Sequence, residues 1–171
     1  FIALVLGAVM SIGCCEQEPS FEASVDYDIV DGVIILDEPQ RVEGQQSVLE
    51  LRCAPLDTVR VGFVGLGMRG PGAVERFTYI EGVAIKALCD KYLERAEACQ
   101  YYLDAQGMPR ADVYSGDEGY KALCEREDID LVYIATPWQL HVAVAVYAME
   151  HGKHVAIEVP SANTVAECWQ L

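Results

Sequence analysis

The segment at residues 65–70, Gly-Leu-Gly-Met-Arg-Gly, directly follows a strand-like apolar run at residues 59–64. A second apolar run, residues 83–89, is followed by Asp90, twenty residues after the last glycine. This order of strand, glycines and acidic residue is the dinucleotide-binding fingerprint. Its first glycine permits a tight turn, the second lets the backbone approach a pyrophosphate, and the third lets a helix pack closely on the sheet. The sequence therefore predicts a dinucleotide site at a helix N-terminus, where N–H groups and the helix dipole favour an anion.

Asp90 also predicts which dinucleotide binds. A carboxylate at this position accepts hydrogen bonds from the ribose hydroxyls of adenosine and repels the 2′-phosphate of NADP. We therefore expect NAD as the cofactor. The alternative is a glycine-rich turn of another α/β fold, which would not require a strand, a helix and an acidic residue at these spacings.

Strand-like and helix-like segments alternate from residue 58 onwards. The run at residues 131–135 is apolar throughout, which is typical of a parallel strand buried on both faces. Short connections between alternating elements predict a Rossmann-type α/β fold with a doubly wound parallel sheet. We expect strands at residues 59–64, 83–89, 113–114, 131–135 and 154–157, and helices at residues 71–79, 93–105, 118–126, 140–150 and 165–171.

The N-terminal residues differ in character from this domain. Residues 1–10 are apolar but too few to span a bilayer, and they lead to Ser11-Ile12-Gly13-Cys14. This pattern resembles a bacterial lipoprotein signal in which Cys14 is acylated, and an ordinary cleaved signal is the alternative. Both predict export to the bacterial envelope or periplasm. We expect a signal peptide at 1–13, a tether and a hairpin arm with an Asp-Gly turn at 14–57, and the nucleotide-binding domain at 58–171.

Charge and cysteine content exclude other classes of function. The chain has 27 acidic and 12 basic residues, a formal charge of −15, and no cluster of Lys or Arg, so we expect no nucleic-acid partner. Its seven cysteines form no C-x-x-C pair and no spacing with histidine that suits zinc. We therefore expect no metal, and interpret Cys89, Cys99, Cys124 and Cys168 as small buried apolar residues.

In a doubly wound sheet, ligands bind at the carboxyl ends of the strands. The residues that follow each expected strand are therefore the candidate site. After the glycine-rich segment and Asp90, these are the residues at 136–141 (Thr-Pro-Trp-Gln-Leu-His) and at 158–160 (Glu-Val-Pro).

These segments resemble the glucose-fructose oxidoreductase superfamily over residues 58–171. The carriers of the resemblance are Ala-Thr-Pro at 135–137 with a histidine five residues past the threonine, and Glu-x-Pro at 158–160. The continuation Met-Arg-Gly-Pro-Gly at 68–72 and the stretch from residue 114 to 154 are similar to the NAD-dependent family-109 glycoside hydrolases. Ordinary dehydrogenases of the superfamily carry Lys where this chain has Val159, so a cation for proton transfer is absent here. That difference favours the glycosidase branch, whereas Pro137 departs from the acidic residue expected there.

The resemblance implies a set of cofactor contacts in three groups: the pyrophosphate side, the adenosine ribose and the nicotinamide half. Arg69 could instead be a solvated residue, Trp138 or His141 could serve packing alone, and Glu158 could be an ion-pair partner. The implied cofactor-binding residues are Gly65, Gly67, Met68, Arg69, Gly70, Asp90, Thr136, Trp138, Gln139, Leu140, His141, Glu158 and Val159.

The resemblance also implies a reaction. It consists of transient oxidation of a sugar at C3, loss of the C2 proton, elimination of the C1 substituent, addition of water and return of the hydride. The implied substrates are N-acetylgalactosamine glycosides. We interpret the chain as a fragment that lacks the substrate domain, with the catalytic groups beyond Leu171 and no turnover of its own. An exported NAD-dependent sugar dehydrogenase and a non-catalytic binding module are the alternatives, and a homo-oligomer is left open.

Overall fold

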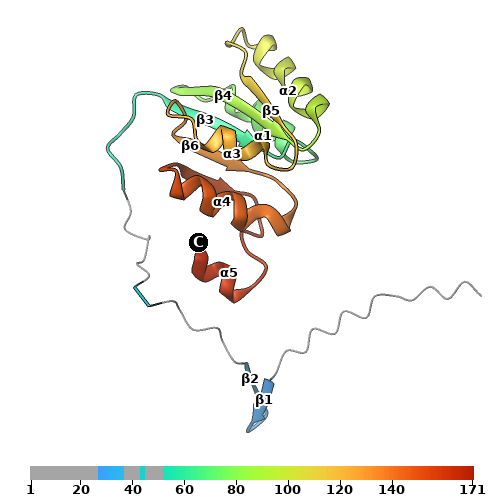
Figure 1. Cartoon of the computed structure of the whole chain (residues 1–171), viewed down its shortest axis with the longest axis vertical. Coiled ribbons are helices and arrows are strands. Elements are labelled where there is room, and N and C mark those ends of the chain that lie inside the picture. The colour runs from blue at the N-terminus through green and yellow to red at the C-terminus, as the bar shows by residue number, and fades with distance from the viewer. Residues whose placement is uncertain (1–26, 37–42, 45–51) are drawn as a thin grey trace, which may run out of the picture. The chain divides into compact units, whose positions relative to one another are not determined.

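The computed structural model describes residues 27–36, 43–44 and 52–171 (Figure 1). The expected signal peptide and Cys14 lie outside these residues. The chain forms two units, which divide between Asp37 and Glu38, and each is described by itself. In the described part of the chain, no helix has both the length and the apolar character needed to cross a membrane.

The first unit contains the expected hairpin. Strands β1 (Tyr27–Val30) and β2 (Val33–Leu36) pair in antiparallel register around a two-residue turn. Asp31 and Gly32 both have positive φ angles, 51° and 80°, as a type I′ turn requires. The Asp-Gly pair therefore forms the turn that the sequence predicts.

The second unit is a five-stranded parallel sheet in the order β5-β4-β3-β6-β7. The chain enters at the central strand, and the order reverses between β3 and β6, which is the topological switch point of a doubly wound sheet. The predicted fold class is confirmed. The strands are β3 (Val59–Val64), β4 (Val83–Asp90), β5 (Asp112–Ser115), β6 (Leu131–Ile134) and β7 (His154–Ile157).

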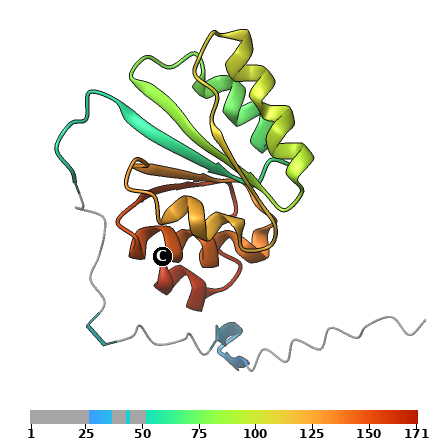
Figure 2. The ribbon, with the colours of Figure 1, turned by 45° about the horizontal axis from the view of Figure 1, so that its top comes forward.

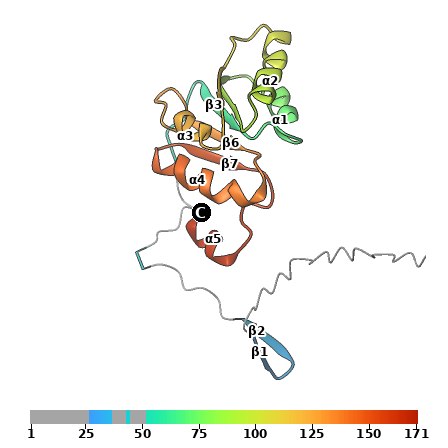
Figure 3. The same cartoon turned by 45° about the vertical axis from the view of Figure 1, so that its right-hand side comes forward.

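Helices cover both faces of this sheet (Figure 2 and Figure 3). Helices α1 and α2 lie on one face, and α3 and α4 lie on the other. A short 3₁₀ helix precedes α4, so the helix expected from residue 140 begins with a tighter turn. The helices are α1 (Gly70–Phe77), α2 (Leu93–Ala105), α3 (Gly119–Cys124), the 3₁₀ helix η1 (Trp138–Leu140), α4 (His141–Glu150) and α5 (Val165–Gln170).

Alternation along β3 divides the core into two clusters. Val61 and Phe63 face the cluster beneath α1 and α2, whereas Val64 faces the cluster beneath α3 and α4. The ring of Phe63 packs edge-on against Phe77 of α1, with centroids 5.2 Å apart. Residues 61–64 of the central strand are therefore covered on both faces, which explains why this part of the strand has no polar side chain.

Three cysteines take the buried positions that we expect. Cys89, Cys99 and Cys124 are buried, and burial raises the pKa of the Cys89 and Cys124 thiols to about 12. The expectation for Cys168 is wrong, because its side chain is exposed on α5. This helix has six residues, and none of them is buried. Its helical pattern therefore did not indicate a buried position for Cys168.

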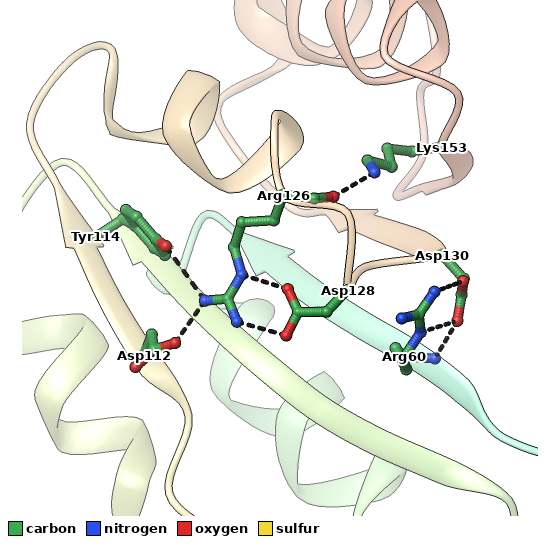
Figure 4. Close-up of polar contacts among 7 residues, drawn as sticks. All are labelled: Arg60, Asp112, Tyr114, Arg126, Asp128, Asp130 and Lys153. Carbon is green, nitrogen blue, oxygen red and sulfur yellow. Dashed lines mark hydrogen bonds and ion pairs between the residues drawn. The ribbon is translucent and has the colours of Figure 1, made fainter.

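Ion pairs connect the amino ends of the strands (Figure 4). Asp130, directly before β6, accepts hydrogen bonds from the backbone N–H of Arg60 at 2.9 Å and from its Nη2 at 2.6 Å. Arg126 pairs with Asp128 and Asp112, at 2.7 and 2.6 Å. The Arg60 guanidinium lowers the pKa of Asp130 to about 2. This network lies at the end of the sheet opposite to the predicted site, so we assign it to stability.

The Asp130→Asn variant should lose about 1–2 kcal/mol of unfolding free energy at pH 7, because it removes a carboxylate that the fold keeps ionised. The pKa of Asp130 is about 2 in the folded chain, below its ordinary value of 3.8. The stabilisation is therefore fully present above pH 3.8 and is lost as the pH falls towards 2. At pH 3 the difference from the unmodified chain should be about half as large. Urea denaturation at both pH values measures it. Asp104→Asn, which breaks an exposed pair with Arg110, serves as the control and should change little. Equal losses in both variants would contradict the assignment.

Candidate dinucleotide site

The three fingerprint glycines have three different surroundings. Gly65 has a φ of 91°, and a Cβ there would lie 2.5 Å from the backbone of Thr136. A Cβ on Gly70 would lie 2.1 Å from the carbonyl oxygen of Gly65. A Cβ on Gly67, in contrast, would have Arg95 Nη1, at 3.6 Å, as its nearest neighbour among the described residues. The first and third glycines are therefore required by the fold itself, whereas the second leaves open space where a pyrophosphate can approach.

Asp90 holds this glycine-rich loop against the end of β4. Its side chain is buried, Oδ2 accepts the backbone N–H of Leu66 at 2.7 Å, and Oδ1 accepts that of Tyr92 at 2.9 Å. Arg95 Nη1 lies 3.6 Å from Oδ1. This structural role of Asp90 was not predicted from the sequence. Each carboxylate oxygen can accept a further hydrogen bond, so the expected contact with a ribose stays a prediction.

A cleft of about 710 Å³ opens at the carboxyl ends of the strands. Most of the residues expected to bind the cofactor line it, together with Arg95, which the sequence analysis missed. The signal for Arg95 would have been a basic residue in the first turn of the helix after Asp90. Gly70 lies beneath the loop, and Gln139 and Leu140 do not line this cleft. The residues that line it are Gly65, Leu66, Gly67, Met68, Arg69, Asp90, Arg95, Ala135, Thr136, Pro137, Trp138, His141, Glu158 and Val159.

A second, smaller cavity of about 240 Å³ lies between the ends of β4 and β6. Tyr92, Tyr120, Leu140 and Val144 contribute apolar walls, so Leu140 belongs to this cavity. At its edge, Lys91 Nζ pairs with Asp117 at 2.8 Å. An apolar slot beside the Asp90 carboxylate suits the adenine ring of a dinucleotide whose ribose binds at Asp90.

Thr136 lines both cavities and carries an unused hydroxyl. In the described part of the chain, its Oγ1 is buried with no hydrogen-bond partner. A buried hydroxyl without a partner is costly, which suits a site that a polar ligand completes. Together with the free space at Gly67, this shows that the residues present fit a bound dinucleotide.

His141 connects the two loops at the far side of the cleft. Its side chain is fully buried, with Nδ1 at 2.7 Å from the carbonyl oxygen of Pro160 and Nε2 at 2.9 Å from that of Thr136. The two ring nitrogens thus lie within hydrogen-bond distance of carbonyl oxygens, one after β6 and one after β7. The side chain lies in the cleft wall and fixes the distance between these two loops.

Exposed apolar side chains lie around the cleft, on the glycine-rich loop and on the loops after β6 and β7. Met68 is 91 % exposed and Val159 is 82 % exposed, although both are apolar. Trp138 is also exposed, and the side chain of Asn163 donates a hydrogen bond to its carbonyl oxygen at 3.2 Å. Packing against the sheet therefore does not account for Trp138. Exposed apolar side chains around a polar cleft are typical of a binding surface.

These features define the class of protein: a dinucleotide-binding Rossmann domain. The family model described as "Oxidoreductase family, NAD-binding Rossmann fold" matches residues 59–171, and the chain belongs to this family, Gfo/Idh/MocA. The expected family and NAD cofactor are confirmed.

Curated relatives carry the glycosidase name. The chain is 51 % identical over 174 residues to glycosyl hydrolase family 109 protein 4 of Phocaeicola vulgatus, an alignment that covers 99 % of this chain and 34 % of that protein. It is 58 % identical over 139 residues to family 109 protein 1 of Bacteroides thetaiotaomicron, covering 81 % and 30 % of the two chains. The chain thus spans about a third of the length of these relatives.

Solved structures share the fold. A myo-inositol dehydrogenase from Lactobacillus casei, in complex with NAD(H) and myo-inositol, matches with a TM-score of 0.56 and 28 % identity over 64 % of this chain and 31 % of that one. A biliverdin reductase from Synechocystis, in complex with biliverdin and NADP⁺, matches with a TM-score of 0.51 and 34 % identity over 64 % and 32 %.

Gly67→Ala should leave the melting temperature unchanged, because the added Cβ has open space, but weaken NAD⁺ binding about tenfold or more by occupying the pyrophosphate approach. Gly70→Ala is the matched comparison: its Cβ overlaps the Gly65 carbonyl and should cost about 1–3 kcal/mol of stability. Thermal unfolding and calorimetric titration separate the two. Unchanged NAD⁺ affinity in Gly67→Ala would contradict the site.

Thr136→Val should stabilise the chain without cofactor by about 1 kcal/mol, since it removes a buried hydroxyl that has no partner in the described residues. The same change should weaken NAD⁺ binding about fivefold, because the cofactor loses a polar partner. Thr78→Val, at a hydroxyl that donates to the Glu75 carbonyl away from the cleft, is the control and should leave affinity unchanged. A Thr136→Val chain that binds NAD⁺ as before would show that the hydroxyl has no role in the site.

Proposed function

We propose that this chain is the NAD-binding domain of a family-109-type glycosidase that cleaves N-acetylgalactosamine-type glycosides by transient oxidation at C3. Three lines of support exist: membership of the NAD-binding family, high identity to proteins named glycosyl hydrolase family 109, and the cleft itself. We propose this activity for the whole protein, because the chain spans only about a third of the length of these relatives.

The observation that carries the proposal is Val159. Its side chain is exposed at the cleft, in the position where dehydrogenases that this chain resembles carry Lys. The basic residues that line the cleft, Arg69 and Arg95, belong to the glycine-rich loop and the first turn of α2. A lysine beside the substrate would assist deprotonation of a hydroxyl in a net oxidation. Its replacement by an apolar side chain supports a reaction in which other groups move the protons.

Bound NAD⁺ would supply a reversible hydride acceptor, so that the redox change cancels within one turnover. This chain's residues perform the binding. The loop at Gly67 and the first N–H groups of α1 would hold the pyrophosphate, and Asp90 would hold the adenosine ribose. Glu158 and Trp138 would border the nicotinamide half. The groups that transfer protons to and from the sugar would come from the remaining length of the protein.

A dehydrogenase is the second candidate function. The specific observation in its favour is the structural match to a myo-inositol dehydrogenase that was solved with its NAD(H) and substrate. Such an enzyme would release reduced cofactor at each turnover, which distinguishes the two candidates directly.

Export and lipidation form a separate proposal, which rests on the sequence of residues 1–14 alone. The apolar run and Cys14 favour a protein anchored to the bacterial envelope by an acylated cysteine. Labelling of growing cells with a radioactive fatty acid tests this: the label should enter the protein and be lost in Cys14→Ser.

The complete gene product, purified without added cofactor, tests the enzymatic proposal. Release of nitrophenol from p-nitrophenyl N-acetylgalactosaminide with no net NADH is the expected result, because the hydride returns to the sugar. The same protein is also incubated with free sugars and NAD⁺. Net NADH from a free sugar, without nitrophenol release, would overturn the proposal in favour of the dehydrogenase.

A further inference from the structure

The phenol of Tyr133 lies behind the cleft and is held by aromatic packing. The centroid of its ring, on β6, lies 5.4 Å from the ring centroid of Phe63 and 5.5 Å from that of Phe77. The rings of Phe63 and Phe77 also pack on each other. This three-ring cluster fixes the direction of the hydroxyl. Tyr133 is not among the residues that line the cleft.

The hydroxyl of Tyr133 donates to Glu158 Oε1 at 2.5 Å. The register between β6 and β7 pairs Tyr133 with Ala156, so Glu158, two residues further, lies on the same face of the sheet. Burial raises the pKa of Tyr133, and the Glu158 carboxylate raises it further, while Arg76 on α1 acts in the opposite direction. The phenol therefore remains a protonated donor, and a cleft residue receives a rigid hydrogen bond from the core.

Sheet order places Glu158 in one half of the site. Asp90 ends β4 on one side of the switch point, and Glu158 follows β7 on the other. Both carboxylates line the large cleft, but of the two only Asp90 also lines the smaller cavity. The two halves of a dinucleotide bind the two halves of a doubly wound sheet. Because we expect the adenosine ribose at Asp90, we expect Glu158 to lie in the nicotinamide half.

We propose that Tyr133 is a positioning residue that holds the Glu158 carboxylate in the nicotinamide half and so favours binding of NAD⁺ over NADH. The inference rests on the NAD-binding function of the domain. The oxidised nicotinamide ring carries a positive charge that the reduced ring lacks. A fixed carboxylate in the same half of a partly desolvated cleft attracts the oxidised form more strongly. Tyr133 matters because a hydrogen bond from a packed ring keeps that carboxylate from rotating into solvent.

Tyr133→Phe tests this, because it keeps the ring in the three-ring cluster and removes only the hydroxyl. Calorimetric titration of the chain with NAD⁺, NADH and ADP-ribose is the measurement. NAD⁺ should bind about three- to tenfold more weakly, whereas NADH and ADP-ribose should stay within about twofold. Tyr102→Phe removes a hydroxyl from another partly buried tyrosine of the same core cluster, away from the cleft, and should change none of the three.

Glu158→Gln provides the second variant, since it removes the charge but keeps a similar shape. It should lower the NAD⁺ to NADH preference at least as much, and Tyr133→Phe should add little to it. Equal weakening of all three ligands, or an unchanged preference, would overturn the inference. If the unmodified chain binds none of the three ligands, the proposed function of the domain fails as well, so the two failures are distinguishable.

Discussion

The carboxylate of Asp90 is the contact on which the site depends. It accepts two backbone N–H groups, from Leu66 and Tyr92, and thereby joins the glycine-rich loop to the end of the neighbouring strand. The loop can take this path only because Gly65 and Gly70 have no Cβ, since a Cβ at either position would overlap backbone atoms. With the loop fixed, the N-terminus of α1 points at the cleft, and the open space at Gly67 lies where the fingerprint requires it.

The two ends of the sheet divide stability from binding. At the amino ends, Arg60 and Arg126 are paired with carboxylates, and polar groups there find partners within the protein. At the carboxyl ends, the buried hydroxyl of Thr136 has no partner among the residues that the structure describes, and Val159 and Met68 are apolar but exposed. Such local costs are common at functional sites, where a ligand provides what the fold leaves incomplete.

Local pattern was enough to predict the elements: β3, α2 and β7 have the predicted bounds, and the Asp-Gly pair forms the hairpin turn. It could not predict contacts that depend on strand order. Two such contacts join segments far apart in the sequence: the hydrogen bond from Leu66 to Asp90 and the hydrogen bond from Tyr133 to Glu158. The position of Arg95 in the cleft depends in the same way on how the strands are ordered. His141 shows the same limit: the sequence reveals its spacing from Thr136 but not that its ring lies between the carbonyl oxygens of Thr136 and Pro160.

Hydrogen–deuterium exchange of the chain with and without NAD⁺ is the decisive measurement, because it reports where the cofactor binds. With NAD⁺ bound, backbone amides should exchange more slowly in the glycine-rich loop at residues 65–70 and in the loops that follow β6 and β7. The ion-paired amino ends of the strands should exchange as before. Unchanged exchange at residues 65–70 in saturating NAD⁺, or protection confined to the amino ends, would contradict it.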